Sequence, residues 1–347
     1  MLKSRPIIKI VGILIGALLL IAIGVLVYAK IWQPWWSPFK IVPEKEIQTA
    51  LWKMSKLNTL RTDVELNFES TEGKIDAQLI SDLDISNSQK PKSISDLKVI
   101  LSAKGYELTL GSKVINLTDE FYLKIENALL PYSLFLPKEW IKFDQESLKN
   151  LGLPVKVEKQ DEKIEKLKKD LIELLKDKQL YLVSQVLPIE EINGKKNYHY
   201  VIVLNREELI KLAPDFSNLL NQYILDLIED SPMPISAEEK AEMEETLKEK
   251  LPQGLTEFVN QVSQMPIELW IGKKDSYLYR LKTEQLIDIT AGNQKQTLLV
   301  KININFSNFN QPVNIAIPQE VKPIDELLRE LFLSYSQGLG NQLPLSE

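Results

Sequence analysis

The chain has 347 residues, and its 48 acidic and 42 basic side chains give a formal net charge of −6 at pH 7. Because the two signs are interspersed, the sequence offers no broad basic surface of the kind that binds nucleic acid. It contains no cysteine, which excludes a disulfide framework, thiol catalysis, Cys-ligated metal sites and the lipid-bearing cysteine of a lipoprotein. Stability must therefore come from burial and hydrogen bonding.

The N-terminal region carries the uncharged stretch IVGILIGALLLIAIGVLVY, residues 10–28. At ~1.5 Å per residue, a helix of this length covers about 28 Å of a hydrocarbon core ~30 Å thick. We therefore expect one transmembrane helix over residues 10–31. Lys3, Arg5 and Lys9 precede it without an acidic residue, so residues 1–9 are expected in the cytoplasm. This topology predicts a single-pass protein of the cell membrane with an extracytoplasmic C-terminal domain.

Residues 32–43 form an aromatic, proline-containing linker typical of a membrane interface. The amphipathic rings of Trp32, Trp35 and Trp36 suit that environment. A signal peptide cleaved after Ala29 is the alternative, because Val27-Tyr28-Ala29 ends in a small residue. The apolar stretch is longer than the ~7 to 15 residues of a signal-peptide core, which favours an uncleaved anchor.

Apolar periodicity predicts the first elements of the outer domain. A stripe at helical spacing predicts a helix from Glu44 to Leu57. Period-two alternation then predicts short antiparallel strands. These strands are expected at residues 64–68, 75–79, 83–85, 97–103, 106–110, 113–117, 121–125 and 140–143. A charged helix with one apolar stripe is expected over residues 158–178.

The second half of the chain begins with a hairpin, residues 179–192 and 196–204, whose Asn193-Gly194 dipeptide favours a type I′ turn. Asn205 is expected to cap a helix that runs through Leu212, and a second helix is expected to begin after Pro214, with an apolar stripe from Phe216 to Ile228. Ser236 and Glu239 form a capping box for a helix to about residue 250, and a further helix is expected over residues 254–263. The last predicted elements are strands at residues 267–272, 277–290 and 296–307, a helix at residues 323–335 and a loose tail at residues 337–347.

About a dozen strands in two blocks, separated by helices, indicate an α+β fold: an antiparallel β-sheet with helices on one face. The two blocks need not be separate domains. We therefore expect a single extracytoplasmic domain over residues 44–336, with a helical insertion at about residues 205–264.

Several segments carry a family resemblance, and they are Trp52–Leu57, Phe121–Ile125, Glu139–Asp144, Glu268–Gly272, Tyr277–Leu281 and Asn303–Ser307, leading to Pro318. In this order they resemble the LolA-like superfamily, especially the LppX and LprG type of lipoprotein, over residues 44–144 and 180–320. The resemblance implies a curved half-barrel sheet closed by helices around a cavity that binds lipids or lipidated chains for transport between membranes. Related domains also serve as periplasmic sensors. The missing cysteine and the uncleaved-looking span depart from the family and argue against free shuttling.

Residue types that carry chemistry are sparse. His199 is the only histidine, and one histidine supports neither a Cys/His nucleophile pair nor a multi-His metal site, so we expect a structural role. The sequence contains no nucleotide-binding glycine motif, Gly-x-Ser-x-Gly elbow or Asp-x-Asp-x-Asp-Gly calcium loop. We therefore predict a protein that is not an enzyme and that uses no cofactor or metal.

Two hypotheses for function follow. The first is a membrane-anchored domain that binds a lipid or another hydrophobic ligand without a covalent bond, in a cavity of several hundred Å³. The residues expected to line it are Trp140, Phe143, Phe216, Leu220, Tyr223, Trp270, Tyr277 and Tyr279. Ordinary core packing explains the same periodicity. The second hypothesis is an envelope sensor or protein-interaction domain with a filled core and an exposed apolar patch. The ligand and the oligomeric state are left open.

Overall fold

A computed structural model describes residues 42–87, 90–118, 120–127, 137, 139–151, 158–229, 236–291 and 294–340. The predicted transmembrane helix at residues 10–31, the cleavage site after Ala29, the interface residues Trp32, Trp35 and Trp36, and residues 341–347 of the tail lie outside these ranges. Of the helices that the structure describes, none combines the length and apolar character needed to cross a membrane. The chain divides into unit 1, residues 1–56 and 156–285, and unit 2, residues 57–155 and 286–347.

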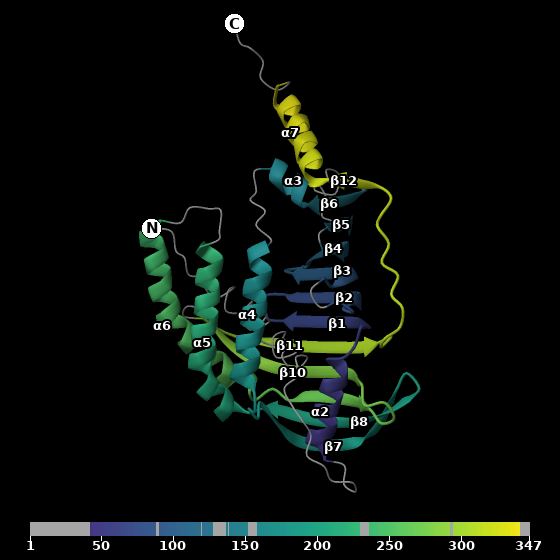
Figure 1. The fold of residues 1–347 in the computed structure, drawn as a ribbon, viewed down its shortest axis with the longest axis vertical. Coiled ribbons are helices and arrows are strands. Elements are labelled where there is room, and N and C mark those ends of the chain that lie inside the picture. Colours follow the sequence, from purple (N-terminus) through teal and green to yellow (C-terminus); the bar gives the residue numbers. More distant parts are fainter. Residues whose placement is uncertain are drawn as a thin grey trace. The chain divides into compact units, whose positions relative to one another are not determined.

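Unit 2 is built on a sheet whose strands follow the order β12-β6-β5-β4-β3-β2-β1-β11 (Figure 1). The strands are β1 (Thr59–Glu69), β2 (Lys74–Asp84), β3 (Lys92–Ala103), β4 (Tyr106–Leu117), β5 (Glu120–Asn127), β6 (Trp140–Asp144), β11 (Gln294–Ser307) and β12 (Val321–Pro323). Consecutive strands from β1 to β6 pair antiparallel, as does β1 with β11, whereas β12 pairs parallel with β6. Most of this sheet is thus the predicted meander.

In two places the sequence analysis predicted two short strands, whereas the structure has a single longer strand. Residues 106–110 and 113–117 were predicted to be separate because Gly111 interrupts them, but β4 is continuous, and the sheet absorbs Gly111 as a shift of register against β5. Residues 75–79 and 83–85 are likewise joined in β2. Glycine in a strand often marks such an irregularity without ending the strand.

The described helices of unit 2 lie near β6 and β12. Helix α3 (Gln145–Asn150) starts at a capping box, in which the Asp144 carboxylate accepts from the Ser147 amide at 2.8 Å. Helix α7 (Ile324–Gly340) extends beyond its predicted end at residue 335. The two helices contact each other and β6, and α7 also contacts β12.

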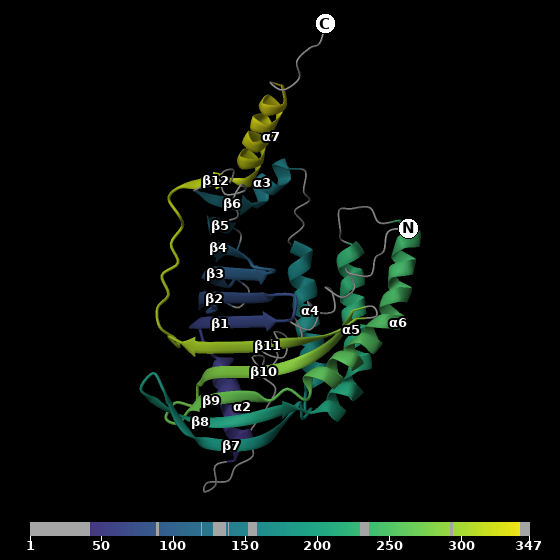
Figure 2. The same ribbon diagram turned by 180° about the vertical axis from the view of Figure 1, so that it is seen from behind.

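Unit 1 contains a second antiparallel run of strands, in the order β10-β9-β8-β7. The strands are β7 (Tyr181–Ile192), β8 (Lys195–Leu204), β9 (Ile267–Gly272) and β10 (Leu278–Ala291), whose residues from Leu286 on belong to unit 2. The turn between β7 and β8 has positive φ at both Asn193 (50°) and Gly194 (75°), which confirms the predicted type I′ geometry. Figure 2 shows β7, β8, β9 and β10 side by side in this order, seen from behind.

Four helices complete the described part of unit 1: α2 (Pro43–Met54), α4 (Glu158–Leu175), α5 (Arg206–Glu229) and α6 (Ala237–Val262). Helix α2 contacts β7 and β9, and α5 contacts both α4 and α6 (Figure 1). The α4–α6 core contains Leu171, Leu212, Phe216, Leu251 and Leu255. The predicted capping box of Ser236 and Glu239 at the start of α6 is confirmed.

Helices α5 and α6 each run through a proline, so the predicted helix breaks near Pro214 and Pro252 are wrong. A proline inside a helix removes one backbone hydrogen bond and strains the preceding turn. Apolar residues on one side of each helix are buried on both sides of the proline: Ala213 and Phe216 around Pro214, and Leu251 and Leu255 around Pro252. Tertiary burial of the apolar stripe therefore outweighs the local penalty.

The predicted α+β class with a curved, unclosed antiparallel sheet is confirmed. The strand order of unit 2 ends at β12 and that of unit 1 ends at β7, so neither run of strands closes on itself.

Candidate functional site

One face of the unit 2 sheet carries only uncharged side chains at the paired positions of β1 to β6 and β11. At the β12 end, Lys322 pairs with Ile141 of this face. Cross-strand partners share a face, and Leu66, for example, pairs with Ala77 on one side and Ile302 on the other. We call this surface the apolar face. Its apolar residues are Leu60, Val64, Leu66, Phe68, Ile75, Ala77, Leu79, Leu83, Leu97, Val99, Leu101, Ala103, Leu108, Leu110, Val114, Phe121, Leu123, Ile125, Ile141, Phe143, Val300, Ile302, Ile304 and Phe306. Its residues with a polar group are Thr62, Ser81, Ser93, Ser95, Tyr106, Ser112 and Asn116.

Much of the apolar face stays accessible to solvent. Ile75 is 42% exposed, Leu110 and Phe121 are each 38% exposed, and Leu97 is 36% exposed. Leu66, Leu79 and other central members are half-buried. Within unit 2, the described helices α3 and α7 pack at the β6 and β12 end. In the described part of unit 2, helices therefore cover the sheet only near β6 and β12.

The opposite face of the same sheet is charged and carries ion pairs. Arg61 lies 3.3 Å from Asp82, Lys74 lies 2.9 Å from Asp76, and Lys113 lies 2.8 Å from Glu126. An antiparallel sheet with one solvated face normally buries the other. The apolar face is therefore the side built to exclude water.

A polar network sits on the charged face where β5 meets β6. Lys142 lies 2.7 Å from Glu120 and 2.9 Å from Asp144, and the Tyr122 hydroxyl donates to Glu120 at 2.6 Å. The hydrogen bonds from Lys142 and Tyr122 lower the pKa of Glu120. Burial, together with the bond to Glu120, raises the pKa of Tyr122 to about 12. Each group holds a partner, so the network fixes strands and offers no poised acid or base.

The structure does not bring Trp140 and Phe143 onto one surface. They are three residues apart on β6, so they point to opposite faces of the strand. Phe143 belongs to the apolar face, where its ring meets that of Phe121 edge to face at 5.5 Å. Trp140 lies on the face that carries Lys142.

Phe216, Leu220 and Tyr223 lie together on α5. Phe216 is 9% exposed and belongs to the α4–α6 core, against which Leu220 packs. Tyr223 is half-buried one turn further along the helix. Packing between helices accounts for Phe216 and Leu220 as ordinary core residues.

Trp270, Tyr277 and Tyr279 have separate surroundings in unit 1. Trp270 stacks on His199, with 4.2 Å between ring centroids. The Tyr279 hydroxyl donates to Asp275 at 2.6 Å. Tyr277 is half-buried, and the Lys53 ammonium lies 5.9 Å from its ring centroid. Whether any of the eight predicted residues contacts a ligand stays a prediction.

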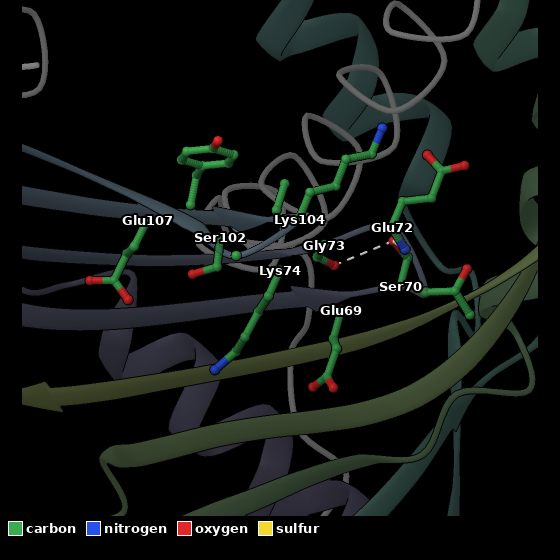
Figure 3. Close-up of a pocket in the computed structure, with 12 residues that line it drawn as sticks. Glu69, Ser70, Glu72, Gly73, Lys74, Ser102, Lys104 and Glu107 are labelled. Atoms are coloured by element: carbon green, nitrogen blue, oxygen red, sulfur yellow. Dashed lines mark hydrogen bonds between the residues drawn. The ribbon is translucent and has the colours of Figure 1, made fainter.

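Two pockets open at the ends of the unit 2 strands. One, of about 460 Å³, lies between the β1–β2 and β3–β4 turns, residues 69–74 and 102–107 (Figure 3). Figure 3 shows Glu69, Glu72, Lys74 and Lys104 pointing in different directions around it. The other, of about 370 Å³, is lined by Asp84, Ser86, Asn87, Lys90, Lys92, Leu117 and Thr118. Both are largely polar, and neither contains any of the eight residues predicted to line an apolar cavity.

The sequence analysis correctly predicted strands from the alternating residues of β1 to β3. It did not predict that their apolar side chains form one continuous face. The signal was the absence of charge at every second position, for example Val64, Leu66 and Phe68. The assembled face also depends on which strands are neighbours, and β1 pairs with β11 from the far end of the chain. Among the residues that the structure describes, no three His, Asp or Glu side chains gather as a metal site.

Comparison of the sequence with known families gives a partial match. The model of a family of unknown function, DUF6612, matches residues 223–325. No curated protein matches the chain significantly.

Solved structures show similarity at low identity. LprF from Mycobacterium bovis is 14% identical, with a TM-score of 0.38, over 80% of this chain and 98% of that one. The lipoprotein LppX of Mycobacterium tuberculosis is 13% identical, with a TM-score of 0.33, over 78% and 97%. A DUF1329 family protein from Desulfovibrio piger is 8% identical, with a TM-score of 0.20, over 79% and 94%. They include the LppX type that the sequence resembles, and we draw no functional conclusion from similarities of this size.

Proposed function

We propose that this protein binds a lipid or another aliphatic ligand, without a covalent bond, on the apolar face of unit 2. The observation that carries the proposal is the continuous uncharged face that stays open at residues such as Ile75, Leu97 and Leu110. Covering apolar surface is favourable by ~25 cal/mol per Å². An open apolar surface of this extent in a folded domain therefore favours an occupant.

The composition of the face favours an acyl chain over a protein partner. Protein interfaces are enriched in Trp, Tyr and Arg, which supply most of their binding energy. The apolar face consists mainly of Leu, Ile and Val, contains no Trp or Arg, and has one tyrosine, Tyr106, at the start of β4. Flexible hydrocarbon can cover such a surface without polar partners, because van der Waals contact and burial suffice.

The dimensions of the face also suit a lipid. Seven neighbouring strands from β6 to β11 contribute to it. At ~4.8 Å between strands, the face extends about 29 Å across, which is close to the ~30 Å thickness of a bilayer core. Extended acyl chains would therefore fit along it.

The membrane anchor is part of the proposal. Residues 10–31 would hold the domain at the cell membrane, on the extracytoplasmic side, as the basic N-terminus and the apolar stretch suggest. The ligand would then be bound and released at the membrane where the protein stays. The proposed binding partner of the protein is a lipid surface or a lipidated chain.

Native mass spectrometry of residues 40–347, purified without detergent, tests the proposal. The decisive variant is Leu110→Lys on the apolar face, and its matched control is Thr109→Lys, one residue away on the charged face of the same strand. We expect the wild type and Thr109→Lys to carry lipid or take up a fluorescent fatty acid. Leu110→Lys should bind at least tenfold more weakly, because the ammonium would lose water against hydrocarbon.

Equal ligand uptake by the two lysine variants would contradict this assignment of the site. A protein-interaction role is the second candidate, since an open apolar patch is also what that role predicts. Wild-type protein that is folded, free of lipid and unable to take up fatty acid would favour it.

A further inference from the structure

His199 lies between two carboxylates in the sheet of unit 1. It is on β8 and only 4% exposed. Its Nδ1 is 3.1 Å from Glu190 Oε1 on β7, and its Nε2 is 2.8 Å from Glu268 Oε2 on β9. Each ring nitrogen therefore faces an oxygen acceptor on a different neighbouring strand.

This geometry suits the charged form of the ring. Neutral imidazole has one N–H donor and one acceptor nitrogen, whereas imidazolium donates from both nitrogens. The hydrogen bond from the Trp270 indole, more than the nearby charge of His199, lowers the pKa of Glu190, so this carboxylate is ionised near neutral pH. A neutral ring would leave one nitrogen lone pair against a carboxylate oxygen, and an imidazolium satisfies both contacts.

The other charges around the ring are few in the described part of unit 1. The Arg280 guanidinium on β10 lies 5.5 Å from the Trp270 ring centroid, and Lys282 pairs with Glu268 across β9 and β10. The face of Trp270 covers the His199 ring, at an interplanar angle of 21°. An aromatic face is a favourable neighbour for a cation.

The contact matters because β7 is the last strand of its run. Its pairing with β8 shifts register between Val183 and Gln185 and again between Leu187 and Glu190. Just after the second shift, Glu190 contacts His199 on β8 and accepts from Trp270 Nε1 on β9 at 2.8 Å. One side chain thus ties an irregular edge strand to two strands behind it.

We propose that protonated His199 is a pH-sensitive latch that holds edge strand β7 onto β8 and β9. The latch is closed where Glu190 is ionised and the ring carries both protons. It opens as pH rises and the ring loses one proton, and in strong acid once Glu190 is neutralised. Opening would free backbone groups at the edge of the sheet, which are ready to pair with another strand. This device is independent of ligand binding on the apolar face.

Nitrogen NMR of the ¹⁵N-histidine-labelled full chain in nanodiscs tests the charge state, because His199 is the only histidine. We expect the ring signals to change from the imidazolium to the neutral signature as pH rises. In Glu268→Gln the midpoint of the His199 titration should fall by about one pH unit or more, the usual effect of removing an adjacent opposite charge. The control is Glu191→Gln on β7, which pairs with Lys196 and should leave the midpoint unchanged. An unchanged midpoint in Glu268→Gln would overturn the proposal.

Hydrogen exchange of β7 amides separates a latch from a merely structural histidine. After correction for intrinsic exchange rates, protection of residues 185–192 should drop about tenfold as pH rises through the measured midpoint. Glu190→Gln should remove most of this dependence. Protection that is the same on both sides of the midpoint would show that the ring titrates without moving the strand.

Discussion

Gly272, the last residue of β9, has no room for a side chain. A Cβ atom there would lie 2.1 Å from Asp275 Oδ1 and 2.7 Å from Tyr279 Cε2. These two side chains share a hydrogen bond, and Lys195 also donates to the Tyr279 hydroxyl. Burial acts to raise the pKa of Asp275, but the bonds from Tyr279 and the Tyr277 amide, with Lys195, hold that pKa below its usual value. The substitution Gly272→Ala must therefore displace an ionised, hydrogen-bonded carboxylate.

The expected cost follows from what has to move. Losing a hydrogen bond to a charged group costs ~1.5–3 kcal/mol, and overfilling a packed site costs ~1–3 kcal/mol. The two costs overlap, because one movement of Asp275 relieves the clash and breaks the bond. We therefore expect Gly272→Ala to lower the free energy of unfolding by about 2–4 kcal/mol.

Urea unfolding of residues 40–347, followed by circular dichroism, measures the effect. The matched control is Gly254→Ala in α6, where a Cβ atom would meet nothing within 4 Å. Alanine is favoured over glycine inside a helix by up to ~1 kcal/mol, so the control should stabilise the protein. A Gly272→Ala variant within ~0.5 kcal/mol of the wild type, the range of neutral surface changes, would refute the steric reasoning.

Three further changes test local features. The amide and hydroxyl of Ser147 lower the pKa of Asp144 to about 2, so its stabilisation is present above the unfolded value of ~3.9 and is lost as pH falls toward 2. Asp144→Asn keeps an N-cap but should cost about 2 kcal/mol at pH 7 and almost nothing at pH 2; parallel unfolding profiles against pH would contradict this. Gly194→Ala places a Cβ at φ 75° and should cost ~1–2 kcal/mol in urea unfolding. Ser236→Ala removes the α6 cap and should cost ~1 kcal/mol, seen as an earlier loss of helical signal on heating.

Features with a local signal were predictable from the sequence. Asn193-Gly194 specifies its turn through the φ angles that these two residues tolerate, and Ser236 with Glu239 specifies a helix start through side-chain hydrogen bonds. Pro214 and Pro252 gave misleading signals because burial of the surrounding stripe decides whether a helix continues. That burial depends on the folded unit as a whole and cannot be predicted from a short stretch of sequence.

The apolar face was harder to predict from the sequence, because it depends on pairing between strands that are far apart in the chain. Alternation placed Leu66 on a strand face, but only the pairing of β1 with β11 brings Ile302 beside it. We expected a structural role for His199 but no particular partner, and one of its partners, Glu268, is 69 residues away in the sequence. Strand register and neighbour order carry this information, and neither follows from local periodicity.

The same pairing has a consequence for how the protein is made. Strand β1 needs residues 299–307 of β11 as its second neighbour. At ~5–20 residues per second, a ribosome takes roughly 10–50 s to synthesise the intervening chain. During that time strands β1 to β5 have already left the ribosome, with the edge of β1 unpaired and their part of the apolar face exposed. Both features promote aggregation. Nascent chains should therefore rely on a chaperone until β11 emerges, and a chain that stops before residue 299 should be degraded or aggregate.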